Sequence, residues 1–208
     1  MFVILATFQL LGFDTSAPLT QDIADCLFNT GYRHAIFEAQ FGTNYNIDAI
    51  NNYNFAKVAG FKNIDFYIMP TQVLDPTEQI NAVMKKLLDG NVIDNKTKIW
   101  LDAEDTQNYF GYHQENQNFI NEMIQVLINI LGADRVGIYT SLNSWSKLVD
   151  YSWRGVTSQK LWYVKKDGKQ NFYDFASFGG WTRPFIKEYS SEQNLCGLQL
   201  NKDFESGK

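Results

Sequence analysis

The sequence of 208 residues predicts an α/β fold, a modified TIM-like barrel of five strand–helix units followed by three further strands. Two features predict it. Short apolar segments alternate with longer segments whose apolar residues recur every three or four positions, as expected of strands connected by amphipathic helices. After about residue 150 the helical segments stop, and three more strand-like segments follow. Eight strands are enough to close a barrel filled by side chains.

The first three units each begin with a short apolar strand, expected at residues 10–13, 35–37 and 64–69. The helix of the second unit should be capped by Asn44 or Asn46 and end at Gly60, because glycine readily closes helices in the left-handed conformation. The helix of the third unit starts at Asp75 and Pro76. Aspartate is a favoured helix cap, and proline is favoured at the first helical position.

The fourth and fifth units begin with strands expected at residues 98–102 and 136–139. The long helix between them should cover residues 116–131. Its apolar spacing predicts an inward face that consists of Phe119, Met123, Val126, Leu127 and Ile130. A short helix capped by Ser141 or Asn143 completes the fifth unit. The last three strands are expected at residues 161–164, 185–189 and 197–200.

The charge and hydropathy of the chain limit its partners. A formal net charge of −5 argues against a nucleic-acid partner, since such proteins present a basic surface to phosphates. The apolar start of the chain is too short to span a membrane. We expect residues 1–10 to be a short signal peptide or the start of the first strand, and residues 11–208 to form a single barrel domain. We also expect a monomer without stable membrane association.

Metal and histidine chemistry have little support in the sequence. The chain has two cysteines and two histidines, and it contains no CxxC motif or Cys/His cluster of the kind that binds zinc. Aromatic residues are abundant at 15%. They either pack in the core or stack on sugar rings. The tryptophans to which both interpretations apply are Trp100, Trp145, Trp153, Trp162 and Trp181.

The motif Asp102-Ala103-Glu104 ends the fourth expected strand, and Asp14 follows the first. Active sites of such barrels lie at the C-terminal ends of the strands. In an extended chain, residues two apart face the same side, so Asp102 and Glu104 should point together. Two like charges at short range raise the pKa of one of them, and a protonated carboxyl can give its proton to a departing sugar oxygen. The alternative is a solvated acidic turn.

Several motifs then resemble one family. The chain contains G-F-D-T-S at residues 12–16, I-W-L-D-A-E at 99–104, G-I-Y-T-S at 137–141 and L-W-Y at 161–163. In this order they resemble the motifs of glycoside hydrolase family 25, the Chalaropsis-type lysozymes. The segments 65–70, 178–184 and 196–197 resemble the eukaryotic branch found in nematodes and amoebae. The resemblance covers residues 12–204, nearly the whole chain.

This resemblance implies hydrolysis of the β-1,4 bond between N-acetylmuramic acid and N-acetylglucosamine in bacterial peptidoglycan, with no metal or organic cofactor. It implies Glu104 as the proton donor, Asp102 as the residue that tunes it, and Asp14 as a third acid in the cleft. The residues expected to bind the sugar are Tyr67, Tyr139, Trp162 and Asn201. A role in digesting or killing bacteria follows from the family.

The two cysteines, Cys26 and Cys196, either form one disulfide that joins the first helix to the last strand or remain buried free thiols. A disulfide would favour a secreted, lysosomal or phagosomal location, because such bonds persist in oxidising compartments.

The chain departs from the family pattern in three places, the last of which covers two residues. Asn201 stands where the family usually has an aspartate, in a V-D-x-N context, and Glu38 stands where it usually has an arginine. Val164 and Lys165 replace an alanine and an aromatic residue. These changes leave two further hypotheses open: a glycan-binding protein that has lost turnover, and a barrel hydrolase of another polysaccharide such as chitin.

Overall fold

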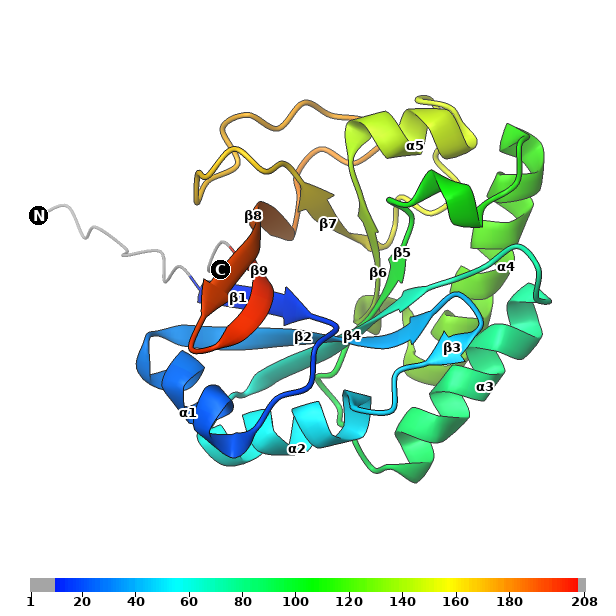
Figure 1. The fold of residues 1–208 in the computed structure, drawn as a ribbon. Helices are drawn as coiled ribbons and strands as arrows, with labels where there is room; N and C mark the ends of the chain where they lie inside the picture. The colour runs from blue at the N-terminus through cyan, green and yellow to red at the C-terminus, as the bar shows by residue number, and fades with distance from the viewer. Residues whose placement is uncertain (1–9, 206–208) are drawn as a thin grey trace, which may run out of the picture.

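The computed structural model describes residues 10–205, which form a closed barrel (Figure 1). The signal peptide or strand start expected at residues 1–10 lies almost wholly outside the described residues. Around the barrel the strands follow the order β1-β2-β4-β5-β6-β7-β8-β9, and β9 pairs with β1 to close it. The pairs β8–β9 and β9–β1 are antiparallel, and the other pairs are parallel. The predicted modified TIM-like barrel is therefore confirmed.

The strands of the barrel are β1 (Leu10–Thr15), β2 (Tyr32–Phe41), β4 (Asn63–Met69), β5 (Ile99–Asp102), β6 (Val136–Thr140), β7 (Lys160–Val164), β8 (Ile186–Leu195) and β9 (Leu198–Glu205). A short strand, β3 (Asn44–Tyr45), pairs with the end of β2. The helices are α1 (Gln21–Asn29), α2 (Ala49–Ala59), α3 (Pro76–Asp89), α4 (His113–Leu131) and α5 (Leu142–Val149). Two 3-10 turns, η1 (Thr106–Asn108) and η2 (Ala133–Arg135), flank α4.

Helix starts mostly follow the sequence signals. Asp75 accepts a hydrogen bond from the N–H of Glu78 at 2.9 Å, and Ser141 accepts one from the N–H of Ser144 at 3.1 Å. The start of α2 differs from the prediction, because its cap position is Asp48. Asn44 lies in β3, and the side chain of Asn46 accepts the N–H of Asp48, which closes the turn before the helix.

The helices pack on the outside of the barrel and leave the β8–β9 hairpin without a helical cover (Figure 1). The inward face of α4 includes Phe119, Met123 and Leu127 as predicted, but Ile130 is 36% exposed and was wrongly placed inward. No helix within residues 10–205 has the length and apolar character needed to cross a membrane.

A cluster inside the barrel consists of Ile36, Trp100, Trp162 and Ile186. The rings of Trp100 and Trp162 meet edge to face with centroids 5.8 Å apart. Gly137 lies beside this cluster, where a Cβ atom would come within 2.3 Å of the Trp100 ring. A glycine is therefore needed in β6 so that the large indole can fill the barrel.

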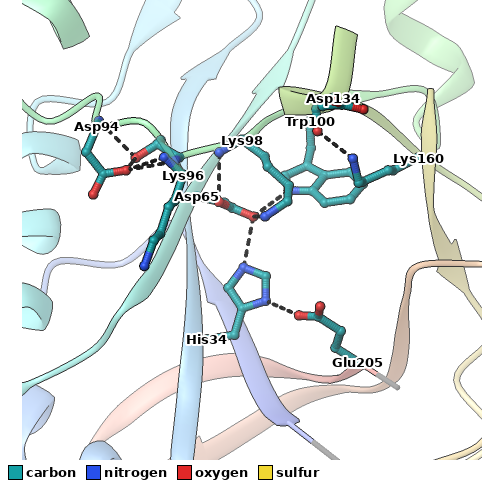
Figure 2. Close-up of polar contacts among 10 residues, drawn as sticks. His34, Asp65, Asp94, Lys96, Lys98, Trp100, Asp134, Lys160 and Glu205 are labelled. Carbon is teal, nitrogen blue, oxygen red and sulfur yellow. Dashed lines mark hydrogen bonds and ion pairs between the residues drawn. The ribbon is translucent and has the colours of Figure 1, made fainter. Parts of the chain in front are cut away.

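A buried ion network closes the N-terminal end of the parallel strands (Figure 2). The imidazole of His34 lies 2.9 Å from Asp65 and 3.3 Å from Glu205, and Asp65 also accepts a hydrogen bond from the Trp100 indole at 3.1 Å. Burial opposes the charged imidazole, but the two carboxylates outweigh it and raise the pKa of His34 to about 9. Asp65 thus takes part in a structural ion pair at the N-terminal end of the strands, opposite the predicted site.

One disulfide ties the two halves of the barrel together. Cys26 in α1 bonds to Cys196 in the turn between β8 and β9, with Cα atoms 6.0 Å apart and a sequence separation of 170 residues. Figure 1 shows this hairpin turn beside α1. The predicted bond between the two cysteines is present in the structure.

Candidate active site

A cavity of about 150 Å³ lies where the parallel strands end. Six of the residues singled out in the sequence line it together with Met69; they are Asp14, Tyr67, Asp102, Tyr139, Trp162 and Asn201. The structure therefore brings together residues from β1, β4, β5, β6, β7 and β9.

Strand register explains why these side chains meet. On neighbouring strands Asp102 pairs with Tyr139, and Tyr139 pairs with Trp162. On the other side of the barrel Asp14 pairs with Asn201, whose amide donates a hydrogen bond to Asp14 at 3.0 Å. Residues at the same level of adjacent strands present their side chains to the same side of a sheet. Register thus accounts for two parts of the cavity wall, Asp102, Tyr139 and Trp162 on one side and Asp14 with Asn201 on the other.

Of the two acids in the D-x-E motif, Asp102 lines this cavity and Glu104 does not. The carboxylate of Asp102 accepts the N–H of Glu104 at 2.8 Å, and Glu104 in turn accepts the N–H of Ser141 at 2.7 Å. Asp102 is 4% exposed, whereas Glu104 is partly exposed. Ser141 lines a second, larger cavity of about 480 Å³. Glu104 itself lines neither cavity, but its hydrogen bonds connect Asp102 of the first with Ser141 of the second.

One carboxyl of the pair has a strongly raised pKa, as the sequence predicted. Burial raises the pKa of Asp102 to about 8; the charges of Glu104 and Glu188 add to the rise, and the N–H of Glu104 opposes it. Asp102 is therefore the group held protonated at neutral pH.

Two further acids of this region were missed in the sequence. Glu188 in β8 is fully buried, accepts a hydrogen bond from the Tyr139 hydroxyl, and lies 3.2 Å from Lys166. Asp203 in β9 is 1% exposed and accepts the Trp162 indole N–H at 2.9 Å. A period of two could have found both, because Glu188 follows the buried Ile186 by two residues and Asp203 follows Asn201 by two.

The other departures from the family pattern also have defined places. Glu38 accepts hydrogen bonds from the Tyr67 hydroxyl at 3.2 Å and from the Asn46 amide at 3.3 Å, and burial raises the pKa of its carboxyl. It orients a tyrosine that lines the first cavity. Lys165 lines the second cavity, along with Ser141.

The tryptophans divide between the cavity and the core. Trp162 lines the cavity, where its ring centroid lies 4.3 Å from that of Tyr139. Trp145 is fully buried and packs against Trp153 and Trp181, with ring centroids 5.4 and 4.9 Å away. Trp162 contributes to the cavity wall although only 1% of it is exposed, and core packing accounts for Trp100, Trp145 and Trp181.

A buried lysine holds the loop beside the cavity. Lys187 is fully buried, and its ammonium lies 2.8 Å from Asp174 and 2.9 Å from Asp167, while it donates to the carbonyl of Asn171 at 3.1 Å. All three acceptors lie in the segment between β7 and β8, which also carries Lys166. The ammonium of Lys187 thus fixes this segment against the barrel.

Within residues 10–205 no group of three or more His, Cys, Asp or Glu side chains is arranged to hold a metal ion. The small cavity has a carboxyl group that is protonated at neutral pH, Asp102. Aromatic side chains and the hydroxyl and amide groups of Tyr67, Tyr139 and Asn201 surround it. Such a set can bind a sugar ring and protonate an oxygen attached to it.

Comparisons with known proteins agree on one family. The family model described as Lysozyme-like protein 1 matches residues 6–189. The chain is 32% identical to the probable GH family 25 lysozyme 5 of Dictyostelium discoideum, with 98% of this chain and 96% of the relative aligned. It is 27% identical to lysozyme-like protein 5 of Caenorhabditis elegans over 93% and 90% of the two chains. The solved structure of a family GH25 lysozyme from Aspergillus fumigatus shares the fold, with a TM-score of 0.77, 17% identity, and 97% and 95% coverage.

Proposed function

The chain belongs to the glycoside hydrolase family 25 lysozymes, in their eukaryotic branch, and we propose that it cleaves the β-1,4 bond between N-acetylmuramic acid and N-acetylglucosamine with Glu104 as the proton donor. It is an enzyme of the lysozyme type, a glycoside hydrolase that acts on peptidoglycan. The bond and the donor are the proposal. The observation that carries it is the pairing of Glu104 with Asp102, whose pKa is about 8.

Glycosidic cleavage needs a proton for the departing oxygen. Glu104 is the more exposed member of the pair, so a bound glycan chain can reach it. The N–H of Ser141 binds one of its carboxylate oxygens and leaves the other for the substrate. Asp102, whose pKa burial raises to about 8, is protonated at neutral pH. Its buried hydroxyl can also donate to an acetamido oxygen on the sugar.

The remaining residues support the positive charge that develops on the sugar ring in the transition state. Asp14 lines the cavity, and its carboxylate, oriented by Asn201, is placed to offer a negative charge against the burial that raises its pKa. Preorganised charges of this kind stabilise a transition state because they need no reorganisation during the reaction. Tyr67 and Tyr139 supply hydroxyl groups, and Trp162 supplies an apolar face. This reaction uses protein carboxyls and needs no metal or organic cofactor.

We further propose a secreted or lysosomal and phagosomal location and a role against bacteria as food or as pathogens. The disulfide between Cys26 and Cys196 supports an oxidising compartment. The raised pKa of Asp102 supports an acidic compartment. Its pKa is about 8 in the folded protein and 3.8 ordinarily, so the folded state binds the extra proton and this group favours folding less as the pH rises from about 4 to 8. The cavity is lined from six strands of a single barrel, which supports action as a monomer, and we propose no stable membrane association.

Mass spectrometry of the products tests the bond, the substrate and turnover together. Digestion of purified peptidoglycan should release muropeptides with N-acetylmuramic acid at the new reducing end, and chitin should be cut far more slowly. Reducing ends of N-acetylglucosamine would contradict the proposed bond, and cleavage confined to chitin would contradict the proposed substrate. Binding of peptidoglycan without new reducing ends would identify a glycan-binding protein instead.

A further inference from the structure

We propose that Asp203 is a positioning residue that shares one proton with Asp14 beneath the cavity and thereby keeps Asp14 ionised during hydrolysis. The inference rests on the proposed function, because the charge of Asp14 matters to the reaction only if the cavity holds the sugar. It adds a residue that no sequence motif indicated.

The register of β1 and β9 places the two aspartates diagonally across the strand pair. Asp14 pairs with Asn201 and Gly12 pairs with Asp203. Because residues two apart on a strand face the same side, Asn201 and Asp203 both face the side of Asp14. The two carboxyls are neighbours across this strand pair, and each affects the pKa of the other. They are 5% and 1% exposed.

Each carboxyl has one oxygen with a known donor and one without. Oδ1 of Asp14 accepts the amide of Asn201 at 3.0 Å, and Oδ1 of Asp203 accepts the indole of Trp162 at 2.9 Å. The second oxygen of each, Oδ2, is buried and has no hydrogen-bond donor within the part of the chain that the structure describes. A proton between the two carboxyls is what would satisfy both second oxygens.

Gly12 provides the space for this arrangement. A Cβ atom at residue 12 would lie 3.1 Å from the Cβ of Asp203 and 3.3 Å from the Cβ of His34. Both contacts are shorter than most real ones, so a side chain here would push Asp203 away from Asp14. The glycine two residues before Asp14 is thus explained by the acid on the neighbouring strand.

The charges around the pair oppose ionisation of both members. The titratable groups that face it are Glu188 and Tyr189 from β8, Tyr67 from β4, Tyr139 from β6, Tyr32 and His34 from β2, Asp102 from β5 and Lys166 from the loop after β7. Lys166 lies against Glu188, and His34 is already paired with Asp65 and Glu205. Two buried carboxylates in contact cannot both carry a charge under these conditions.

The neighbours decide where the proton resides. Burial is the largest cause that raises the pKa of both carboxyls. Asp203 is the more deeply buried of the two, with 1% exposed against 5%, and only Asp14 lines the cavity. The neutral form is therefore favoured at Asp203, which holds the proton and donates it to Asp14. Asp14 then carries a negative charge with both oxygens fixed by donors, one from Asn201 and one from Asp203.

The substitution Asp203→Asn tests whether Asp203 acts as a proton donor to Asp14 or as a second negative charge beside it. Asparagine can still accept from Trp162 and donate to Asp14, but an amide N–H is a weaker donor than a carboxylic O–H. We expect the acid limb of the pH profile of kcat/KM to move to higher pH by roughly one unit, because the Asp14 carboxylate is less stabilised. Asp134→Asn, a change at an exposed aspartate outside the cavity, should leave the profile unchanged.

The direction of the shift decides the proposal. If Asp203 were ionised, its neutralisation would remove a repulsive charge and move the acid limb to lower pH; that outcome, or no shift, overturns the inference.

Infrared spectroscopy gives a second test that needs no activity. Asp203→Asn should remove a carboxylic-acid C=O band at neutral pH from an Asp102→Asn background, where Asp102 itself does not contribute. A band left unchanged would overturn the shared proton even if the protein did not hydrolyse peptidoglycan.

Discussion

Glu104→Gln is expected to lower turnover on peptidoglycan by about 10²–10⁴-fold, the usual contribution of a general acid. The amide has almost the shape of the carboxyl, and its oxygen can still accept the N–H of Ser141, which Glu104 now accepts at 2.7 Å. What the variant loses is the proton that can be given to the departing sugar oxygen. Substrate binding should change much less than turnover.

The measurement is the clearing rate of a bacterial cell-wall suspension, with thermal melting to show that the variant is folded. Glu115→Gln, at an exposed glutamate in the first turn of α4, is the matched control and should clear at the parental rate. Parental clearing by Glu104→Gln would show that the proton comes from another group. Asp102, which is protonated at neutral pH, would then be the next group to test.

Loss of the disulfide should be the largest change in stability. Replacing Cys26 and Cys196 together with serine is expected to lower the free energy of unfolding by about 4–5 kcal/mol, because a bond that closes so long a loop strongly restricts the unfolded chain. The bond joins residues 170 apart in the sequence. A loss of this size is a large part of the roughly 5–15 kcal/mol that is typical of folded proteins.

Urea unfolding of the oxidised protein and of the double serine variant measures this loss. Parent protein treated with dithiothreitol should unfold at the same urea concentration as the variant, which controls for effects of the serines themselves. Equal midpoints for the oxidised protein and the variant would mean that the bond contributes nothing to stability.

Much of the barrel could be predicted because its first five units follow simple periodic rules. Apolar strands alternate with amphipathic helices, and turn and cap residues such as Asp75 and Gly60 mark their ends. Because active sites of this architecture lie at the strand ends, the sequence alone predicts that the motifs around Asp14 and Asp102 meet at one end of the barrel. The cavity confirms that placement.

The last two strands were harder to predict because their inward faces are not apolar. β8 and β9 continue well beyond the expected residues 185–189 and 197–200, and they carry Glu188 and Asp203 into the barrel. In a sequence, a buried acid in a strand resembles a loop residue. Its partners, Tyr139 and Trp162, lie 49 and 41 residues away and cannot be recognised from spacing.

The protonated member of the acid pair also could not be chosen from the sequence. The spacing of Asp102 and Glu104 predicted one raised pKa, but burial decides which carboxyl has it. Asp102 is 4% exposed at the end of β5, whereas Glu104 lies beyond the strand and is partly exposed. The difference arises from the turn that carries Glu104 to Ser141, which is a feature of tertiary structure.

The pH dependence of kcat/KM for the parent and for Asp102→Asn tests the protonated state of Asp102 most directly, because kcat/KM reports ionisations of the free enzyme. The parent should lose activity above about pH 8, where Asp102 ionises. In Asp102→Asn this group no longer titrates, so the basic limb near pH 8 should be lost. A basic limb that stays at the same pH in the variant would contradict the account.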